Sequence, residues 1–534
     1  MRRFVTRRNL LRSAGLTAAG GRHATAREGN AMNAADRRDA AMKLRNDAAT
    51  ARHADSPAPQ AANGDESAVP GYAASFTKSF PHSQAGEVEA GKYETLLRAV
   101  ETGKSSGFET IARGSGRRFV NPQAAYAFCL EGSDPHRFAC PPAPSFTSPE
   151  LAAEMAEMYW LALTRDIPFR EYGVSPSILR IAQDLNTTPN ALFRGQTPGD
   201  LEGPYISQFL VRPVQTVSTV FEQRYRTPSP VNDFMTTYGE WLQIQSGVPP
   251  WREYAWDPAP RYIRNGRDLS EWVHYDFMFQ AFQNAALILM NYRPEAVLND
   301  NRTVLSELNP YKYSKVQDGF VTFGLAQVVD WLGRVSTSAL KAAWAQKWLV
   351  HRRLRPEAFA GRIHQTKTKA VSYPIHADIL NSAALEETYR RWGSYLLPQA
   401  YPEGSPIHPS YPGGHATVAG ACSVVLKATF DENALMPDCV HASASGLSLE
   451  SCPPGFAPTL GNEINKLAFN IAVGRSFAGI HYRSDSMAGM RLGEDVGISI
   501  LQDLVQTCIE DFDGFAFTRF DGTPVRINRN GELN

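Results

Sequence analysis

Residues 408–420 read HPSYPGGHATVAG and mark the start of a helix. A Pro-Gly-Gly turn cannot continue a helix, whereas the small and apolar residues that follow, HATVAGACSVVLKATF, favour one. His415 is therefore predicted at a helix N-terminus. Backbone N–H groups point outward there and the helix dipole favours negative charge, so the stretch predicts an anion site.

The composition limits the classes of function. The chain has 534 residues, enough for one large or two ordinary domains, and its 43% hydrophobic content is typical of a soluble globular protein. Lysine plus arginine equals aspartate plus glutamate, 54 each, so no nucleic-acid partner is expected. No apolar run approaches the ~18 residues that span a bilayer, so no transmembrane segment is expected. An anion site must come from a local cluster of cations.

The N-terminal region differs from the rest of the chain. Residues 1–30 contain TRRNLL and a weakly apolar segment, which together resemble a twin-arginine export signal; a disordered basic tail is the alternative. Export predicts a periplasmic or secreted protein, and a plain tail a cytoplasmic one. Residues 31–90 read as a polar helical arm, able to wrap a partner subunit, and a turn-rich linker. Residues 91–534 are predicted to form an α-helical domain with its site within 340–490.

Helical patterns dominate from about residue 90 onward. Apolar residues recur at three-to-four spacing in five segments: 148–169, 268–292, 319–355, 463–479 and 484–508. Strand signals are few, and the best is GFAFTRFDGTPVRI, where Asp521-Gly522 suits a hairpin turn. The predicted fold class is mainly α, with helical bundles, long loops and a small C-terminal β-hairpin.

The six cysteines contain no CxxC pair, which argues against a zinc or redox motif. Cys129 and Cys140 flank one short polar loop, and Cys439 and Cys452 flank another. Either pair could close a disulfide in an oxidising compartment, and six free thiols are the alternative.

Two further segments concentrate cations and histidines. In QKWLVHRRLRPEA, Lys347 and Arg355 lie eight residues apart, roughly 80° around one helix, so both can face one cleft. Pro356 disfavours continuation of that helix and places Arg355 near its end. In AVGRSFAGIHYRSD, Arg475 lies near the end of an apolar helix that a glycine can break, and His481 follows.

Each of these residues alone has an ordinary explanation. Lys347 suits a solvated helix face, and Arg475 suits a cap on helix carbonyls. Taken together, one lysine, two arginines, a glycine-rich helix N-terminus and two histidines make a pocket for a tetrahedral oxyanion, phosphate or its analogue vanadate. One histidine can bond the central atom and the other can move protons.

The order Lys-x7-Arg-Pro, Pro-x-Gly-His and Gly-Arg-x5-His resembles the vanadium-dependent haloperoxidases, which share fold and site with type 2 phosphatidic acid phosphatases and bacterial acid phosphatases. The Lys347-to-Arg355 spacing is similar to the algal-type bromoperoxidase branch, as is His408, seven residues before His415. Segments 126–160 and 272–291 also look like that branch, and the resemblance covers roughly residues 35–525. It implies two four-helix bundles and a homo-oligomer, a dimer or larger.

The resemblance also implies roles for the site residues. Vanadate oxygens would be held by Lys347, Arg355, Arg475 and the backbone N–H of Gly414. His481 would bond vanadium axially, and His415 would be the acid–base residue at the opposite apex. His408 would hydrogen-bond nearby and tune halide handling. Asp276 is expected, on a weaker basis, to pair with Arg475, and Asp485 reads as a helix cap.

The implied reaction oxidises a halide with hydrogen peroxide to hypohalous acid or an equivalent, which then halogenates a small organic acceptor. His415 would take the proton of hydrogen peroxide, and Lys347 would polarise the peroxide. Vanadium would stay pentavalent and act as a Lewis acid. His408 favours bromide and iodide over chloride.

Gly413 departs from the family pattern, in which a serine hydroxyl bonds the vanadate or peroxide. Losing such a charge-assisted bond costs roughly 1.5–3 kcal/mol unless a water replaces it. Glycine either alters peroxide or halide access, or makes a modest adjustment that the remaining cations absorb.

Two other functions could use the same pocket. An acid phosphatase would use His481 as nucleophile and His415 as leaving-group acid, but the long N-terminal half and His408 argue against it. A non-catalytic oxyanion-binding protein is the second, since Gly413 could mark a decayed site. The other expected site residues are present, which argues against that reading.

Overall fold

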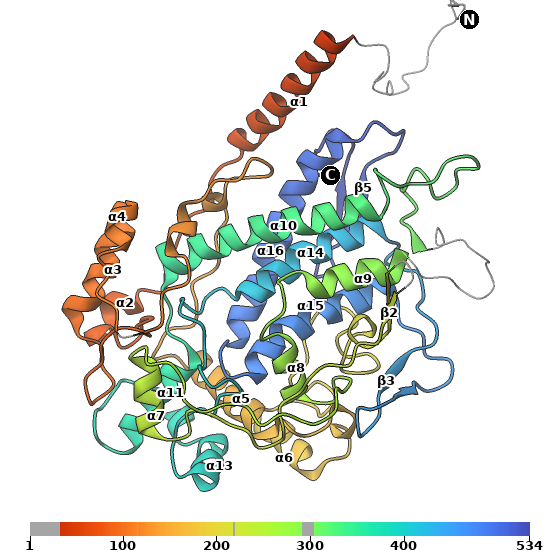
Figure 1. The fold of residues 1–534 in the computed structure, drawn as a ribbon. Coiled ribbons are helices and arrows are strands. Elements are labelled where there is room, and N and C mark those ends of the chain that lie inside the picture. Colours follow the sequence, from red (N-terminus) through yellow and green to blue (C-terminus); the bar gives the residue numbers. More distant parts are fainter. Residues whose placement is uncertain (1–32, 115, 217–218, 291–303) are drawn as a thin grey trace, which may run out of the picture.

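The computed structural model describes residues 33–114, 116–216, 219–290 and 304–534. Residues 1–30, with the expected export signal or tail, lie outside the described residues. In the described part, helices are joined by long loops, and the strands form three two-stranded sheets (Figure 1). The prediction of a mainly α fold is confirmed.

The helices before residue 300 are α1 (Ala34–Ala54), α2 (Asp65–Ala68), α3 (Ala90–Thr102), α4 (Ser105–Phe108), α5 (Pro149–Thr164), α6 (Pro176–Asp184), α7 (Tyr238–Gln245), α8 (Gly266–Trp272) and α9 (Gln280–Met290). Those after it are α10 (Leu325–Ala345), α11 (Pro356–Lys367), α12 (Ala377–Leu380), α13 (Ala383–Trp392), α14 (Gly414–Thr429), α15 (Leu460–Phe477) and α16 (Arg483–Leu504). The antiparallel strand pairs are β1 (Val214–Thr216) with β2 (Thr219–Phe221), β3 (Val440–Ala442) with β4 (Leu449–Ser451), and β5 (Phe515–Thr518) with β6 (Pro524–Ile527).

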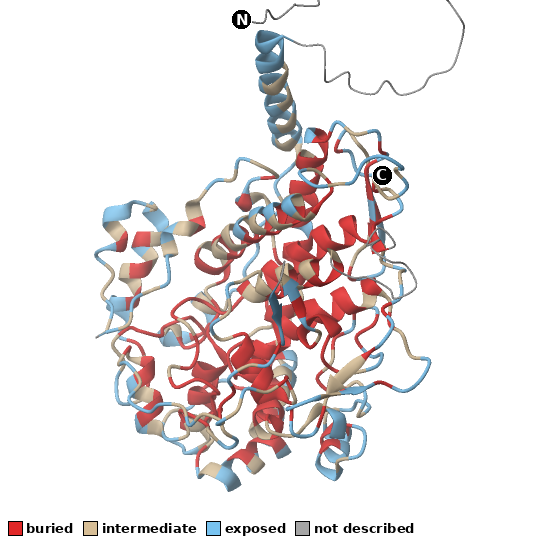
Figure 2. Ribbon diagram, turned by 45° about the vertical axis from the view of Figure 1, so that its right-hand side comes forward, coloured by how far each residue is buried: buried red, intermediate tan, exposed pale blue. Residues whose placement is uncertain are grey.

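The helix α14 is the centre of the main bundle, where α10, α15 and α16 pack around it. Every residue of α14 except His415 is buried, and these helices form the mostly red centre of Figure 2. Glycines allow the close approach of α14 and α16. A Cβ atom on Gly420 would lie 2.1 Å from the Met490 carbonyl oxygen, and one on Gly493 would lie 1.9 Å from that of Thr417. Larger residues there would force the two helices apart.

The helix α5 anchors a second, less regular group of helices. It begins at Ser148, whose hydroxyl accepts the Leu151 N–H at 3.2 Å, as the Ser-Pro start predicts. It packs against α12, α13 and α15. The group's helices α12 and α13 have only 4 and 10 residues, whereas the helices of the main bundle have 16 to 22.

The polar arm is α1, which projects from the body in Figure 1 and buries no residue. Arg52 ties its base to the body by donating to Gln502 Oε1 at 2.9 Å. Residues 69–80, which the sequence grouped with the arm and linker, instead pack into the body, and Phe76 and Phe80 are buried there. The domain boundaries at 30 and 90 stay a prediction.

The predicted C-terminal hairpin is present. β5 and β6 pair Phe515 with Ile527, and the turn between them uses Gly522 in the left-handed region, with φ of 86°. Across the described residues, no helix combines the length and apolar content that a membrane crossing needs.

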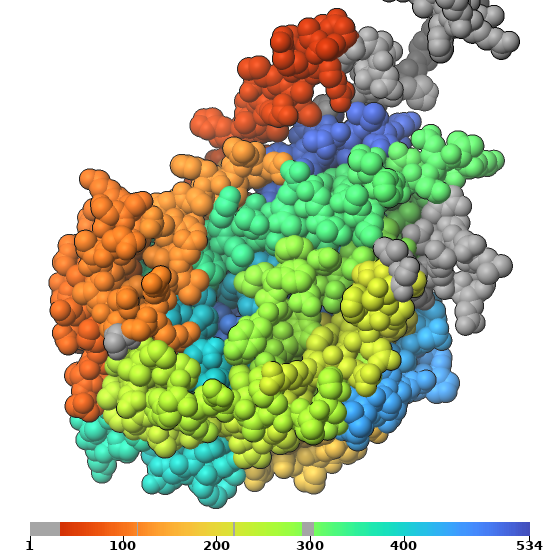
Figure 3. Space-filling view, viewed as in Figure 1, coloured from red at the N-terminus to blue at the C-terminus, as the bar shows by residue number. Residues whose placement is uncertain are grey.

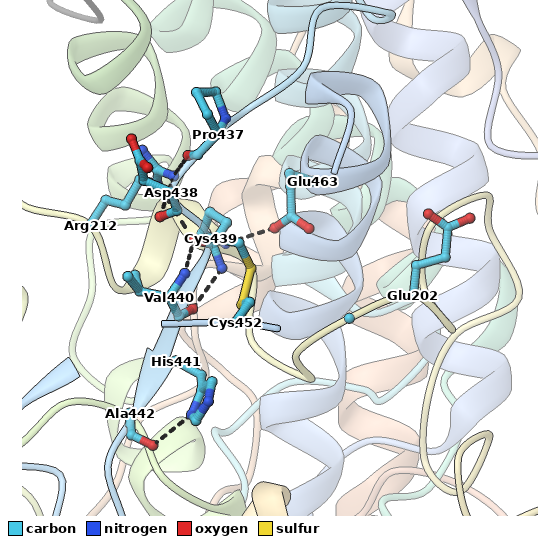
Figure 4. Close-up of a disulfide and its surroundings, with 12 residues drawn as sticks. Glu202, Arg212, Pro437, Asp438, Cys439, Val440, His441, Ala442, Cys452 and Glu463 are labelled. Carbon is cyan, nitrogen blue, oxygen red and sulfur yellow. Dashed lines mark hydrogen bonds between the residues drawn. A yellow bond between two sulfur atoms is a disulfide. The ribbon is translucent and has the colours of Figure 1, made fainter. Parts of the chain in front are cut away.

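One of the two predicted disulfide loops is closed. Cys439 and Cys452 form a disulfide that joins the two ends of the β3–β4 hairpin (Figure 4), so the alternative of six free thiols is wrong. Cys129 and Cys140 are free, and so that predicted pair is not formed.

Candidate active site

The start of α14 forms one wall of the site. Gly413 is the N-cap residue, with φ −68° and ψ 121°, and the helix begins at Gly414, so His415 lies at a helix N-terminus as predicted. No side chain caps this end, which leaves first-turn N–H groups for a ligand. The N–H of Gly413 donates to the carbonyl oxygen of Asp485 at 2.8 Å and ties the start of α14 to α16.

Lys347 lies in a π-helical turn, Gln346–His351, that continues α10. Such turns often carry functional residues because they shift the side-chain spacing of a helix. The side chain is fully buried, and its Nζ donates to the carbonyl oxygens of Pro409 at 2.8 Å and Ser410 at 2.7 Å. A solvated face is therefore the wrong explanation for Lys347. One of its three donors is left for a ligand.

Arg355 does not share a helix with Lys347, contrary to the prediction. It is the N-cap of α11, with φ −82° and ψ 156°, and Pro356 is the first helical residue. A residue before proline avoids the helical region and proline favours the first turn, so the chain leaves one helix and starts another here. The two cations still lie close together, since the charge of Arg355 adds to burial in lowering the pKa of Lys347.

His408 is buried beside Arg355. The Nη2 atom of Arg355 lies 3.0 Å from Nδ1 of His408, and its Nε donates to the His408 carbonyl oxygen at 3.0 Å. The Trp344 ring packs against the imidazole with 4.8 Å between ring centroids. Burial lowers the pKa of His408 well below its usual value, and Arg355 and Lys347 lower it further, so this imidazole is neutral near pH 7.

Arg475 lies in the last turn of α15, as predicted. Its Nη1 donates to the Val273 carbonyl oxygen at 2.7 Å and to the Tyr401 hydroxyl at 3.4 Å. Its Nε is buried and has no hydrogen-bond partner. An unpaired buried guanidinium nitrogen is costly, and a ligand oxygen would satisfy it.

His481 follows the end of α15, where Gly479 has a φ of 90° and breaks the helix as predicted. The Nδ1 atom of His481 lies 2.8 Å from Oδ2 of Asp485, and its Nε2 lies 2.9 Å from Nη1 of Arg355. Because Nδ1 donates to the carboxylate, Nε2 carries the lone pair that ligation needs. Burial and then Arg355 lower the pKa of His481 well below its usual value, which keeps that lone pair free of a proton.

Asp485 has two tasks, of which the sequence predicted one. It caps α16 by accepting the N–H of Tyr482 at 3.1 Å, and it also orients His481. Arg353 donates to its Oδ1 at 2.9 Å, and the Ser410 hydroxyl bonds Oδ2. Burial alone raises the pKa of Asp485, but Arg353, with the bonds from His481 and Ser410, outweighs burial and lowers it.

Arg353 and Ser410 belong to the site, although no sequence pattern predicted them. Ser410 lies within the opening stretch, but nothing in that pattern shows that its hydroxyl faces Asp485. Arg353 is one of three arginines in HRRLR, and only the fold separates its neighbours. Arg352 bonds Glu66 away from the site, whereas Arg353 and Arg355 turn inward.

Asp276 pairs with His415 rather than with the predicted partner, Arg475. Its Oδ1 lies 3.0 Å from Nε2 of His415. The expected helix over 268–292 is interrupted between α8 and α9, and Asp276 lies in that break, close to the start of α14. Burial lowers the pKa of His415, whereas the charge of Asp276 acts in the opposite direction.

Gly413 leaves limited room for a side chain. A Cβ atom there would lie 3.2 Å from the Asp485 carbonyl oxygen and 3.4 Å from the Ala416 Cβ. The φ of Gly413 is negative, so a serine would meet no backbone strain. The carbonyl of Asp485 would have to move by a few tenths of an ångström to admit one.

The site contains more buried positive charge than negative. Lys347, Arg355 and Arg475 are each less than a tenth exposed. Asp485 is already matched by Arg353, which leaves Asp276, beside His415, as the other carboxylate of the described site. Burial lowers the pKa of Arg355 to about 9. An oxyanion would balance this charge and accept a bond from the unpaired Nε of Arg475, so the residues fit such a group. Figure 3 shows a hollow bordered by α10, with cyan and blue atoms of the C-terminal half at its floor.

Comparisons with known proteins place this site within a matched region. The family model described as the VCPO second helical-bundle domain matches residues 332–511, which include every cation and histidine of the site but not Asp276. The chain is 35% identical over 495 residues to a vanadium-dependent bromoperoxidase of Ascophyllum nodosum, covering 86% of this chain and 87% of that protein. It is 33% identical over 568 residues to a vanadium-dependent bromoperoxidase of Corallina officinalis, covering 88% and 92%.

A solved structure is also similar to this chain over nearly its whole length. It is the homohexameric structure of the second vanadate-dependent bromoperoxidase (AnII) from Ascophyllum nodosum, with a TM-score of 0.87 and 29% sequence identity. The match covers 96% of this chain and 94% of that one.

Proposed function

The chain belongs to the vanadium-dependent bromoperoxidases, and we propose that Lys347, Arg355 and Arg475 hold the vanadate with which it oxidises bromide. Hydrogen peroxide and a halide are the substrates that this family membership implies. The observation that carries the residue assignment is the buried excess of cations, in which one guanidinium nitrogen lacks a partner. Vanadate is an oxyanion of the charge and shape that such a cluster binds.

The oxygen-binding groups come from four parts of the fold. Lys347 offers its remaining donor from the π turn, and Arg355 adds its guanidinium charge from the start of α11. Arg475 offers its Nε from α15, and α14 offers its first-turn N–H groups. When bound, vanadate supplies a Lewis acid that polarises peroxide without a change in its own oxidation state. Burial makes each donor stronger, because water does not compete for it.

His481 is the proposed vanadium ligand, through Nε2. Asp485 fixes the tautomer by accepting a hydrogen bond from Nδ1–H, and Arg353 and Ser410 hold the carboxylate in place. Partners of this kind commonly change metal affinity 10- to 100-fold when they are removed.

His415 is the proposed acid–base residue, and its Nδ1 is the atom that exchanges the proton. Its Nε2 donates to Asp276, which leaves the lone pair on Nδ1. Burial keeps the imidazole neutral and able to accept a proton from hydrogen peroxide, while Asp276 stabilises the cation that results.

His408 is the proposed determinant of halide preference. It is buried, packs on Trp344 and bonds Arg355, so it sets the polarity beside the oxyanion site. We propose that bromide and iodide are oxidised in preference to chloride and that a small organic acceptor is then halogenated.

Location and assembly follow as further proposals. The Cys439–Cys452 disulfide supports export to an oxidising compartment, periplasmic or extracellular, because disulfides persist there. The homohexameric relative and the exposed arm α1 support a homo-oligomer, which size-exclusion chromatography with light scattering would measure.

One assay tests the function and separates it from the two alternatives. Metal-free protein receives vanadate, hydrogen peroxide and each halide in turn, with monochlorodimedone as the trap, and phosphate-ester hydrolysis is measured in parallel. Vanadate-dependent bromination is the expected result. Ester hydrolysis that vanadate inhibits would indicate a phosphatase, and tight vanadate binding without peroxide-dependent turnover a non-catalytic protein. Chloride oxidation as efficient as bromide oxidation would contradict the role of His408.

A further inference from the structure

A second cavity lies outside the oxyanion site. It has a volume of about 590 Å³, within the range of small-molecule sites. One wall is formed by the segments 168–173 and 189–206, and the opposite wall by the β3–β4 hairpin and residues that follow it. None of the cations or histidines assigned to the oxyanion site lines it.

The first wall is aromatic and well ordered by its own packing. The rings of Phe169 and Tyr205 stack with 3.9 Å between centroids and 2° between planes, and Tyr172 meets both edge-on. The Phe456 ring covers Gly203 so closely that a Cβ there would lie 2.4 Å from it. Flat, mutually packed rings of this kind favour a planar ligand.

The cavity is lined by arginines and by no carboxylate side chain. Arg264 is paired with Asp268, and Arg170 is paired with Glu450. The Nη atoms of Arg194 donate only to backbone carbonyl oxygens, those of Asp200 at 2.7 Å and Gly203 at 3.0 Å. Its charge therefore lacks a directly bonded carboxylate, the group that a guanidinium binds best.

The opposite wall adds a hydrogen-bonding group and a covalent tether. His441, on β3, places Nδ1 3.1 Å from its neighbour's carbonyl oxygen, which leaves Nε2 for a ligand (Figure 4). The Cys439–Cys452 disulfide fixes the hairpin, and Cys452 itself lines the cavity. The disulfide thus fixes the shape of this wall, and neither cysteine is among the residues assigned to the oxyanion site.

We propose that this cavity binds a small planar aromatic carboxylate. The ring lies among the aromatic side chains, and the carboxylate lies between Arg194 and the Nε2 atom of His441. Aromatic walls alone would suit a neutral ring, but Arg194, whose Nη atoms bond only backbone carbonyl oxygens, favours an anion.

The test is calorimetric titration of the full-length protein with benzoate, and with benzyl alcohol as the neutral counterpart. We expect saturable benzoate binding and at least tenfold weaker binding of the alcohol, since the alcohol cannot form a charge-assisted bond with Arg194. Arg194→Gln and Phe456→Ala should each weaken benzoate binding by about tenfold. Arg391→Gln, on the exposed surface of α13, is the matched control and should bind benzoate like the parent protein.

Two results would overturn the proposal: no saturable binding of benzoate, or binding that both cavity variants leave unchanged. If Arg194→Gln fails to fold, Phe456→Ala decides, because its ring lies at the partly exposed rim. Replacing both Cys439 and Cys452 by serine should also weaken benzoate binding relative to the parent protein, because the hairpin is then no longer held by the disulfide. Bromide oxidation should be the same in Phe456→Ala as in the parent protein. The benzoate titration measures binding and needs no turnover, so its result does not depend on the proposed activity.

Discussion

Two helices, α14 and α16, begin at the same site, but their N-termini are capped differently. The start of α16 is filled by its own Asp485, which accepts the N–H of Tyr482. The start of α14 has two glycines and no side-chain cap, so its first-turn donors stay open. The ends touch, because the Gly413 N–H bonds the Asp485 carbonyl oxygen. One carboxylate built into the chain thus orients His481, while the neighbouring helix end has no side-chain cap and suits an anion.

Removing the built-in carboxylate should have the largest effect. Asp485→Ala deprives His481 of its partner and leaves Arg353 bonded only to Glu154 and the Ser484 hydroxyl. We expect a loss of about 3–5 kcal/mol in the free energy of unfolding, as for other broken buried ion pairs. Urea unfolding of the metal-free protein measures it.

Vanadate affinity in this variant should fall by about 10- to 100-fold. Asp378→Asn, an exposed carboxylate beside His376, is the control and should change neither quantity. Near-parent stability of Asp485→Ala would show that the filled helix end is not what organises this site.

The open end is tested by removing a cation that faces it. Arg475→Gln can keep the bond to the Val273 carbonyl but loses the charge and the unpaired Nε. We expect vanadate affinity to fall by about tenfold or more, because charge-assisted bonds contribute about 1.5–3 kcal/mol. Calorimetric titration of metal-free protein with vanadate measures this without relying on turnover. Parent-like affinity, with Arg391→Gln as control, would remove Arg475 from the proposed binding set.

A smaller effect, on pH dependence, should come from Asp276→Asn. Asp276 raises the pKa of His415 against the effect of burial, so the amide variant should have a lower pKa there. His415 must be neutral to accept a proton, and the acid limb of the bromide kcat/KM profile should therefore move to lower pH. A limb that stays in place, or moves to higher pH, would contradict the pairing of these two residues.

Gly413→Ser should have the smallest effect and bears directly on the open helix end. The new hydroxyl adds one donor near the oxyanion, while its Cβ must displace the Asp485 carbonyl slightly. These effects oppose each other, so we expect vanadate affinity to rise by less than about tenfold and bromide turnover to change little. Gly413→Ala has the same Cβ without the hydroxyl and separates the two effects. A serine variant that gains far more than tenfold would show that the glycine impairs the site.

The sequence determined the residue types of the site and several of its helix ends. Pro-Gly-Gly before His415, Gly479 before His481 and Asp485 at the start of α16 are local signals, and each acts within a few residues of the chain. Backbone preferences of proline, glycine and short polar side chains are local properties, so they can be read without knowing the fold.

Only the tertiary structure decided which of these groups meet. Asp276 and His415 are 139 positions apart in the sequence. They pair because the expected helix is interrupted between α8 and α9, and Asp276 lies in that interruption. Arg353 reaches Asp485 because the π turn and the Pro356 start redirect the segment after Lys347. Long-range pairing depends on helix packing. Gly420 and Gly493 set how closely α14 and α16 approach, and so how close their two N-termini lie. The cations could be identified in the sequence. Helix packing brought them together as a buried cluster with excess positive charge, which favours an anion.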